Sequence, residues 1–322
     1  RQDTDLALAI GTKLADFTTG SWANFENPNF KLVSVNTARY DTTKHLATPV
    51  ISDAKVGLQK ISEALGDWKA PDDWYKRAIK EKNEWDAYVE KQSGPTNQEE
   101  PSYAHAVGAV YRNSDPSDIV VTAAGGLVGE VVQVWKPKQL NTFETEWGFS
   151  CMGYEISGAL GIKMAKPDQD VVVFVGDGSY LLNNTDIYSS VIYDQKLIII
   201  VCDNGGHMVI NRLQLAKGGK EYICNLRAAR ATNLKFVDFE NHAKSMGANA
   251  ETVSSTSELE AAYKRAKDSD KTYVITIKTH GYEWLEGTAF WESPTLQDPI
   301  TDNNKSALED FESGKSKQRK GI

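Results

Sequence analysis

Two short polar segments, Gly176–Ser179 and Asp203–Gly206, carry the clearest chemical signal in this sequence. Between them they offer three kinds of oxygen: the carboxylate of Asp177, the side-chain amide of Asn204 and the backbone carbonyl of Gly206. Magnesium in proteins is bound by about six oxygens, and waters and phosphate oxygens can complete such a set. The two segments together therefore predict a Mg²⁺ site made by Asp177, Asn204 and Gly206.

The apolar runs before these segments must position them. Residues 171–176 and 196–202 read as β-strands, and a helix is expected between them over about 184–193. In a parallel α/β sheet, strands joined by one crossover carry the loops that follow them at the same edge, where ligands bind. We therefore expect Asp177 and Asn204 to lie close together at the ends of neighbouring strands.

The glycines favour a phosphate group as the partner of that cation. Gly178, Gly205 and Gly206 let the backbone approach an anion closely, and Ser179 stands near a predicted helix entry, where anions bind. The alternative is that both segments are ordinary turns, because each alone is a weak signal.

The spacing of the two segments resembles the cofactor signature of thiamine-diphosphate (ThDP) enzymes. The 24 residues between Gly178 and Asp203 match its length, although this family usually has asparagine where Asp203 stands. Segments Thr122–Glu130 and Glu146–Gly161 resemble the loops that grip ThDP. The resemblance implies ThDP and Mg²⁺ as cofactors. The residues expected to bind the cofactor are Gly125, Gly126, Ser150, Met152, Gly176, Gly178, Ser179, Asn204 and Gly206.

The resemblance also implies individual roles and partners. Met152 is expected under the cofactor, with core packing as the alternative, and the Ser150 carbonyl near the aminopyrimidine amine. Enzymes of this family have a pyrimidine-binding domain, which carries the activating glutamate, and a central domain before the diphosphate-binding domain. The expected partners are therefore a missing N-terminal pyrimidine-binding domain and further copies of the chain, in a dimer or tetramer.

Four segments are similar to trihydroxycyclohexane-1,2-dione hydrolases: Ala123–Leu127, Gly148–Ile156, Gly176–Tyr180 and Ile210–Gln214. The sequence departs from that family at Val128, where proline is expected, and at Arg212, where asparagine is expected. The similarity implies that the substrate is a polyol-derived cyclic 1,2-dione, opened to 5-deoxy-glucuronate in myo-inositol catabolism. The alternatives are a ThDP enzyme for 2-oxo acids, such as an acetolactate-synthase-like ligase or a decarboxylase, and a non-catalytic α/β binding module.

Several side chains are candidates for direct catalysis. His207 and Asn211 follow the second polar segment, and an unperturbed histidine titrates near pH 6.5, so His207 could move protons. A surface or hydrogen-bonded histidine is the alternative. Glu155 is a weaker candidate. The aromatic run within 282–291 either closes over the site or packs, and Cys151, with no base nearby in sequence, is expected to be a small buried residue.

Apolar runs and amphipathic helices alternate along the whole chain, which predicts an α/β fold. The expected strands are 5–11, 31–35, 118–123, 171–176, 196–202 and 273–278. The expected helices are about 53–65, 72–92, 152–166, 184–193, 239–246 and 257–267, with Trp74, Ala78, Trp85 and Tyr88 on the apolar side of the second. The predicted fold is a doubly wound, mostly parallel sheet preceded by part of a second Rossmann-like α/β domain.

The predicted domains follow this pattern. Residues 1–67 are the second half of a central Rossmann-like domain and 68–100 a helical linker; 101–300 form the ThDP diphosphate- and Mg²⁺-binding domain, and 301–322 a polar C-terminal tail. Arg1 is not methionine and the first strand begins almost at once, so the chain is expected to start inside a longer protein.

The composition of the 322-residue chain argues against several classes of partner. Its net charge is −8, and no long basic stretch indicates nucleic-acid binding. No apolar run reaches the ~20 residues of a membrane span. Three cysteines are few and odd in number, so they do not suit a disulfide framework. Thiols of this kind suit a reducing compartment, and a cytoplasmic location is expected.

Overall fold

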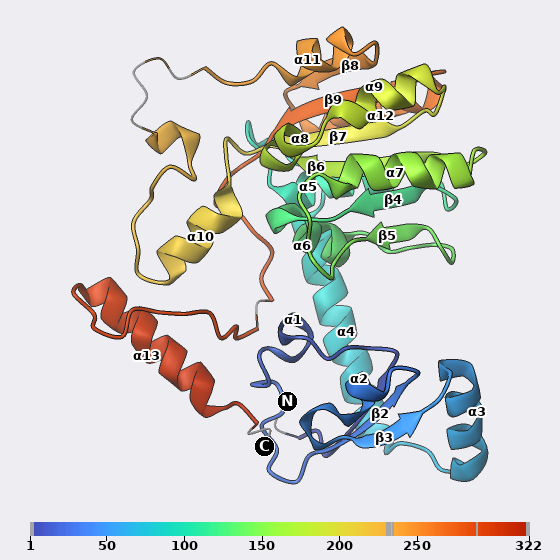
Figure 1. Ribbon diagram of the computed structural model, residues 1–322, viewed down its shortest axis with the longest axis vertical. Helices are drawn as coiled ribbons and strands as arrows, with labels where there is room; N and C mark the ends of the chain where they lie inside the picture. Colours follow the sequence, from blue (N-terminus) through green and yellow to red (C-terminus); the bar gives the residue numbers. More distant parts are fainter. Residues whose placement is uncertain (1–2, 230–232, 234, 288, 320–322) are drawn as a thin grey trace. The chain divides into compact units, whose positions relative to one another are not determined.

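The computed structural model describes residues 3–229, 233, 235–287 and 289–319 (Figure 1). The chain divides into two compact units. Unit 1 contains Arg1–Ala78, Ala216–Gly219 and Glu286–Ile322, and unit 2 contains Ile79–Leu215 and Lys220–Leu285. Each unit is described by itself below.

Unit 1 is built on a small parallel sheet in the order β1-β2-β3. Its strands are β1 (Leu6–Ile10), β2 (Lys31–Asn36) and β3 (Thr48–Ile51). Its helical segments are α1 (Asp16–Thr19), α2 (Arg39–Thr43), the 3-10 turn η1 (Lys44–Leu46), α3 (Ala54–Leu65) and α13 (Asp302–Ser316). Asp53 caps α3 by accepting the N–H groups of Lys55 and Val56, which confirms the predicted helix start. Helix α13 is amphipathic and buries Ala307 and Phe311.

Unit 2 contains a six-stranded sheet in the order β5-β4-β6-β7-β9-β8, and every paired strand is parallel. The strands are β4 (Ile119–Thr122), β5 (Phe143–Thr145), β6 (Val171–Gly176), β7 (Ile198–Asp203), β8 (Asn249–Val253) and β9 (Tyr273–Lys278). The two strands that precede the polar segments, β6 and β7, are direct neighbours, with Gly176 opposite Cys202. The expectation of adjacent strands is confirmed.

Helices cover both faces of this sheet (Figure 1). Successive side chains of its central strands point into two different buried cores, one on each face. Phe174 and Ile200 face one core, and Val173 and Ile199 face the other. On the first face lie α5 (Tyr103–Arg112), α6 (Gly125–Val134) and α12 (Thr256–Asp268). On the second lie α7 (Tyr154–Ala165), α8 (Asp177–Leu182), α9 (Thr185–Ile192) and α11 (Phe239–Ser245). The predicted α/β class and doubly wound, parallel sheet are thus confirmed.

Several elements of the fold differ from the prediction. Helix α4 (Asp72–Gln92) forms as predicted, but only part of its predicted apolar side is covered: Tyr88 packs on the unit 2 core together with the buried Val89, whereas Trp74, Ala78 and Trp85 are exposed. The edge strands β3, β5 and β8 were not predicted, because they are short and mix polar with apolar residues. Helix α10 (Met208–Ala216) and the 3-10 turn η2 (Leu226–Ala228) were also missed.

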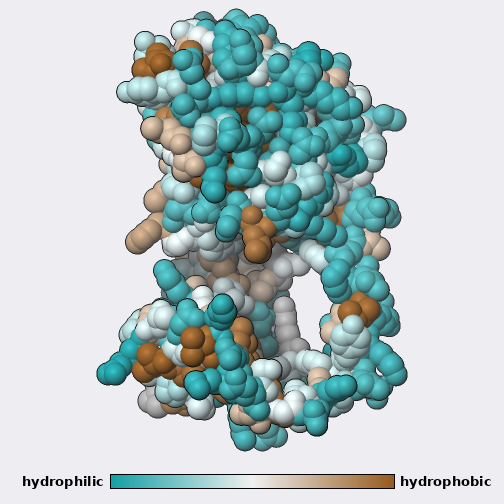
Figure 2. Space-filling view, turned by 90° about the vertical axis from the view of Figure 1, so that its right-hand side faces the viewer, coloured by the Kyte–Doolittle hydropathy of each residue, from teal (hydrophilic) through white to brown (hydrophobic). Residues whose placement is uncertain are grey.

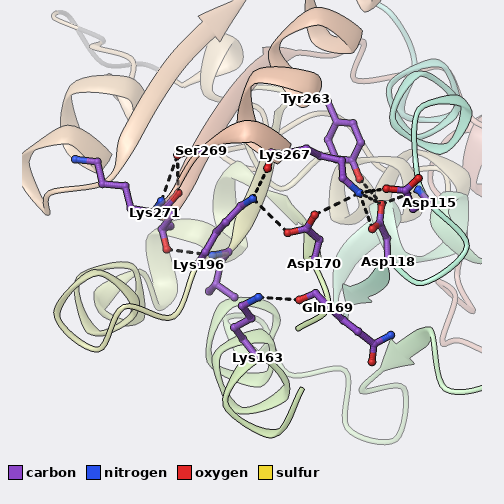
Figure 3. A network of polar contacts seen from close by, with 12 residues as sticks. Asp115, Asp118, Lys163, Gln169, Asp170, Lys196, Tyr263, Lys267, Ser269 and Lys271 are labelled. Carbon is purple, nitrogen blue, oxygen red and sulfur yellow. Dashed lines mark hydrogen bonds and ion pairs between the residues drawn. The ribbon is translucent and has the colours of Figure 1, made fainter. Parts of the chain in front are cut away.

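The amino ends of the central strands are joined by a network of charged groups (Figure 3). Lys267 Nζ lies 2.7 Å from Asp118 Oδ1, which precedes β4, and 3.3 Å from Asp170 Oδ2, which precedes β6. Lys196, just before β7, reaches Asp170 at 3.3 Å. Tyr263 donates to Asp118 at 2.8 Å. Positive groups from the chain itself therefore neutralise the acidic groups at this edge.

The surface seen in Figure 2 is mostly hydrophilic, with small separate hydrophobic patches. In the part of the chain that the structure describes, no helix combines the length and apolar character that a bilayer crossing needs.

Candidate cofactor site

A pocket opens at the opposite, carboxyl edge of the unit 2 sheet. It is lined by the turn after β4, the loop before α7, the turn from β6 into α8 and the segment from β7 into α10. The lining residues are Tyr103, Ala124, Gly125, Gly126, Leu127, Ser150, Met152, Gly176, Asp177, Gly178, Ser179, Asn204, Gly206, His207, Met208, Val209 and Ile210. The structure thus brings together all the residues predicted to bind the cofactor, although they come from four separate segments.

The predicted metal ligands converge within this pocket. One terminal atom of the Asn204 amide lies 3.2 Å from Asp177 Oδ1 and 2.8 Å from the Gly206 carbonyl oxygen, and the other lies 2.5 Å from the Tyr103 hydroxyl. With nitrogen in the first position, the amide donates to both oxygens. With oxygen there, the amide donates to Tyr103, and the Asn204 oxygen lies beside the oxygens of Asp177 and Gly206. The second orientation is the one that a bound cation requires.

The environment of Asp177 makes its negative charge costly without a cation. The side chain is buried, and its Oδ2 accepts the Gly206 N–H at 2.8 Å. Burial, together with the nearby carboxylate of Asp203, raises the pKa of Asp177 to about 7, against backbone N–H groups that lower it. Within the described residues, no group of three His, Cys, Asp or Glu side chains could hold a metal. The candidate site therefore relies on one carboxylate with amide and carbonyl oxygens.

Two glycines allow approaches that a side chain would block. Gly206 has a φ of +144°, and a Cβ there would lie 2.3 Å from the Cys224 carbonyl oxygen. At Gly126, a Cβ would lie 2.3 Å from the Trp284 ring, so Trp284 packs directly on the turn after β4. By contrast, the aromatic residues after residue 286 pack inside unit 1, where Phe290 contacts Phe311 and Trp291 stacks on Phe17.

The loop before α7 presents two of the predicted residues. Ser150 has a positive φ of 52° and donates its hydroxyl to the Ala123 carbonyl at 3.4 Å. Met152 is 37% exposed, so it is not a core side chain. Its methyl group would lie 3.5 Å from a Cβ at Gly178, which places Met152 against the turn from β6 into α8. The core-packing alternative for Met152 is wrong.

The two predicted catalytic residues occupy different surroundings. His207 lines the pocket, and its ring lies over Gly178, where a Cβ would come within 2.7 Å of His207 Cε1. Asn211 is fully buried in α10, and its Nδ2 donates to Glu221 at 3.0 Å; it is not part of the pocket lining. The expectation that Cys151 is buried is wrong: it is exposed, because it lies in the loop before α7 rather than in a helix core.

Two residues of the site carried little or no signal in the sequence. Tyr103 contacts Asn204 from α5, 101 residues away in the chain, and no motif links the two. Glu155 ranked only as a weak catalytic candidate, yet it is almost fully buried and accepts a hydrogen bond from the Ser179 hydroxyl at 2.8 Å. The Ser179 hydroxyl proton is therefore already committed within the protein.

Comparison with known proteins connects this site to a family. Residues 123–277 match the model described as "Thiamine pyrophosphate enzyme, C-terminal TPP binding domain"; thiamine pyrophosphate (TPP) is another name for ThDP. The chain is 33% identical over 311 residues to a protein of Halalkalibacterium halodurans named 3D-(3,5/4)-trihydroxycyclohexane-1,2-dione hydrolase, with 88% of this chain and 49% of the relative covered.

Proteins of the same name from Lacticaseibacillus casei and Bacillus subtilis (strain 168) are each 32% identical to the chain. The two alignments cover 96% and 89% of this chain and 52% and 50% of the relatives. The chain thus spans about half the length of the curated relatives it matches.

A solved structure shares the fold. The thiamine diphosphate-dependent 4-hydroxybenzoylformate decarboxylase of Rhodococcus jostii RHA1 matches with a TM-score of 0.63 at 15% identity, over 86% of this chain and 49% of that chain. Residues 123–277 therefore form a domain of the thiamine pyrophosphate enzyme type, the C-terminal TPP-binding domain.

Proposed function

We propose that this chain is the diphosphate-binding half of a ThDP- and Mg²⁺-dependent hydrolase that opens the ring of trihydroxycyclohexane-1,2-dione to 5-deoxy-glucuronate, in myo-inositol catabolism. The observation that carries the cofactor assignment is the convergence of Asp177, Asn204 and Gly206 at the tips of two adjacent strands. The substrate assignment is supported by the shared name of relatives that are 32–34% identical to the chain.

In this proposal the chain holds the cofactor through two kinds of contact. Asp177 Oδ1, the Asn204 amide oxygen and the Gly206 carbonyl bind Mg²⁺, which in turn holds the diphosphate. The turns that contain Gly125, Gly126, Gly176 and Gly178 bring backbone N–H groups toward the same diphosphate, at the starts of α6 and α8. Neither contact takes part in bond breaking.

The chemistry then depends on residues at the pocket wall. When bound, ThDP supplies the nucleophilic carbon and the electron sink for cleaving the bond between two carbonyl carbons. Met152 supports the cofactor from the loop before α7. His207, beside Gly178, exchanges protons with the substrate. Asn211 lies behind this wall and orients α10 through Glu221.

We propose further that the site is completed by other polypeptide segments. A pyrimidine-binding domain supplies the glutamate that activates the cofactor, and the length of the relatives leaves room for one. The assembled enzyme is a homo-oligomer. It works in the cytoplasm, which the absence of disulfides among its three cysteines supports.

Calorimetric titration tests the cofactor assignment. The chain is titrated with ThDP in the presence and absence of MgCl₂, and binding is expected only with the metal. The Asp177→Ala variant is expected to lose this binding, whereas Asp118→Asn, which changes a buried carboxylate at the amino edge, should keep it. Binding that does not depend on magnesium or on Asp177 would overturn the proposal.

The substrate assignment needs an assay with the pyrimidine-binding domain present. Ring opening is followed as the appearance of an acid from the cyclic dione, and CO₂ release from pyruvate is measured in parallel. The proposal predicts acid from the dione and no CO₂. The reverse result would favour an enzyme for 2-oxo acids.

A further inference from the structure

The Glu155 carboxylate joins three segments of the pocket wall. Glu155 stands in the first turn of α7 and is 1% exposed. It accepts the Ala124 N–H at 3.2 Å from the turn after β4, and the Gly153 N–H at 2.9 Å from the loop before α7. The Ser179 hydroxyl, from the first turn of α8, lies 2.9 and 2.8 Å from its two oxygens.

Gly153 and Ser179 are also linked directly. The Gly153 N–H lies 2.8 Å from Ser179 Oγ, so this hydroxyl accepts from one pocket segment while it donates to Glu155. Gly153 has a φ of +94°, and a Cβ there would lie 2.6 Å from Asn183 Cβ. Gly153, whose N–H donates to Glu155, therefore has a backbone conformation that favours glycine.

The groups around Glu155 donate hydrogen bonds to both of its oxygens, which a carboxylate can accept and a neutral amide cannot. Among the described residues, no lysine or arginine forms an ion pair with Glu155, so its charge is met by N–H and O–H groups and by the N-terminus of α7. Both oxygens act as acceptors, one toward Ala124 and the other toward Gly153. A glutamine would turn its NH₂ group toward one of these N–H donors and break that link.

We propose that Glu155 is a positioning residue that fixes the turn after β4, the loop before α7 and the turn after β6 relative to one another, and thereby sets the affinity for ThDP and Mg²⁺. This inference rests on the proposed cofactor site. Glu155 itself does not touch the cofactor, because its carboxylate is enclosed by the three segments that do. Burial also raises its pKa, which fits a carboxylate held by hydrogen bonds without a cationic partner.

The test compares Glu155→Gln with Asp118→Asn. Both variants neutralise a buried carboxylate of unit 2, but Asp118 lies at the amino edge of the sheet. Hydrogen exchange of the ligand-free chain is expected to speed up at the Ala124 and Gly153 amides in Glu155→Gln and to stay unchanged there in Asp118→Asn. The Mg²⁺-dependent affinity for ThDP is expected to fall roughly tenfold to 100-fold in Glu155→Gln, while Asp118→Asn stays within twofold.

A second variant guards against a folding failure. Ser179→Ala removes one link and keeps both backbone donors, so it should fold and lose less affinity than Glu155→Gln. Wild-type affinity in Glu155→Gln, or unchanged exchange at Ala124 and Gly153, would overturn the proposal. If the wild-type chain itself fails to bind ThDP, the proposed cofactor site fails instead, and the exchange result shows separately whether the carboxylate orders the loops.

Discussion

The acidic groups at the two edges of the unit 2 sheet differ in their ion pairing. At the amino edge, Asp118 and Asp170 are met by Lys267 and Lys196, which the chain itself provides (Figure 3). At the carboxyl edge, Asp177 is about as buried as Asp118, yet among the residues that the structure describes it forms no ion pair with a lysine or arginine. The acidic groups of the first edge are paired within the chain, whereas at the second edge we propose that a cation from solution takes this role.

The largest effect on stability is expected from removing the cation at the amino edge. Lys267→Met leaves Asp118 buried without its cation, which should lower the free energy of unfolding by about 3–5 kcal/mol. Urea unfolding measures this loss. Because the pocket lies at the other edge, the magnesium-dependent affinity for ThDP should stay within twofold. A weaker affinity with unchanged stability would show that the two edges are not independent.

Removing the charge at the carboxyl edge should have the opposite effect on stability. The pKa of Asp177 is raised from 3.8 to about 7, so its stabilising contribution is complete below pH 3.8 and is lost as the pH rises through 7. Without magnesium at pH 8, Asp177→Asn should therefore stabilise the chain, by at most roughly 4 kcal/mol. The same variant should weaken ThDP binding by at least about 100-fold.

The comparison with wild type is needed at each pH, because burial also raises the pKa of Glu130 to about 7. Both groups make wild-type stability fall as the pH rises from about 4.5 to about 7, and only the difference between wild type and Asp177→Asn reports on Asp177. A loss of stability in Asp177→Asn at pH 8 would contradict the account.

Protons should compete with the cation at Asp177. Magnesium binding needs the ionised carboxylate, so the apparent affinity for Mg²⁺ should fall about tenfold for each pH unit below 7. Calorimetric titrations of the chain with MgCl₂ at a fixed ThDP concentration, at pH 6 and pH 8, measure this dependence. An affinity that is the same at both values would show that Asp177 is not a ligand.

The smallest effect concerns Asp203, which stands where the family usually has asparagine. Its carboxylate is the second cause of the raised pKa of Asp177. Asp203→Asn should therefore move the pH midpoint of magnesium binding downward, by less than about one unit. Affinity at pH 8 should hardly change, since Asp177 is ionised there in both proteins. An upward shift would exclude electrostatic coupling between the two residues.

The sequence predicted the parts of the site that local pattern determines. The apolar runs of β6 and β7 and the glycine-rich turns after them follow from nearest-neighbour chemistry, and the crossover rule made the strands neighbours. Contacts between residues far apart in the sequence gave no such signal. Tyr103 is hydrogen-bonded to Asn204, which lies 101 residues away, and Glu155 accepts hydrogen bonds from residues 31 and 24 positions away.

The errors in the fold have a similar origin. Edge strands such as β5, with the sequence Phe-Glu-Thr, are too short and polar to stand out from a loop. Helix α4 has aromatic residues at helical spacing, but spacing alone cannot say whether a partner covers them, and Trp74 and Trp85 remain exposed in this chain.

A crystal of the chain grown with Mn²⁺ and ThDP gives the most direct test of the cation site. The account predicts an anomalous peak in contact with Asp177 Oδ1, the Asn204 side-chain oxygen and the Gly206 carbonyl, with diphosphate oxygens completing the shell. A bound diphosphate with no metal among these three residues, or a metal held elsewhere, would contradict it.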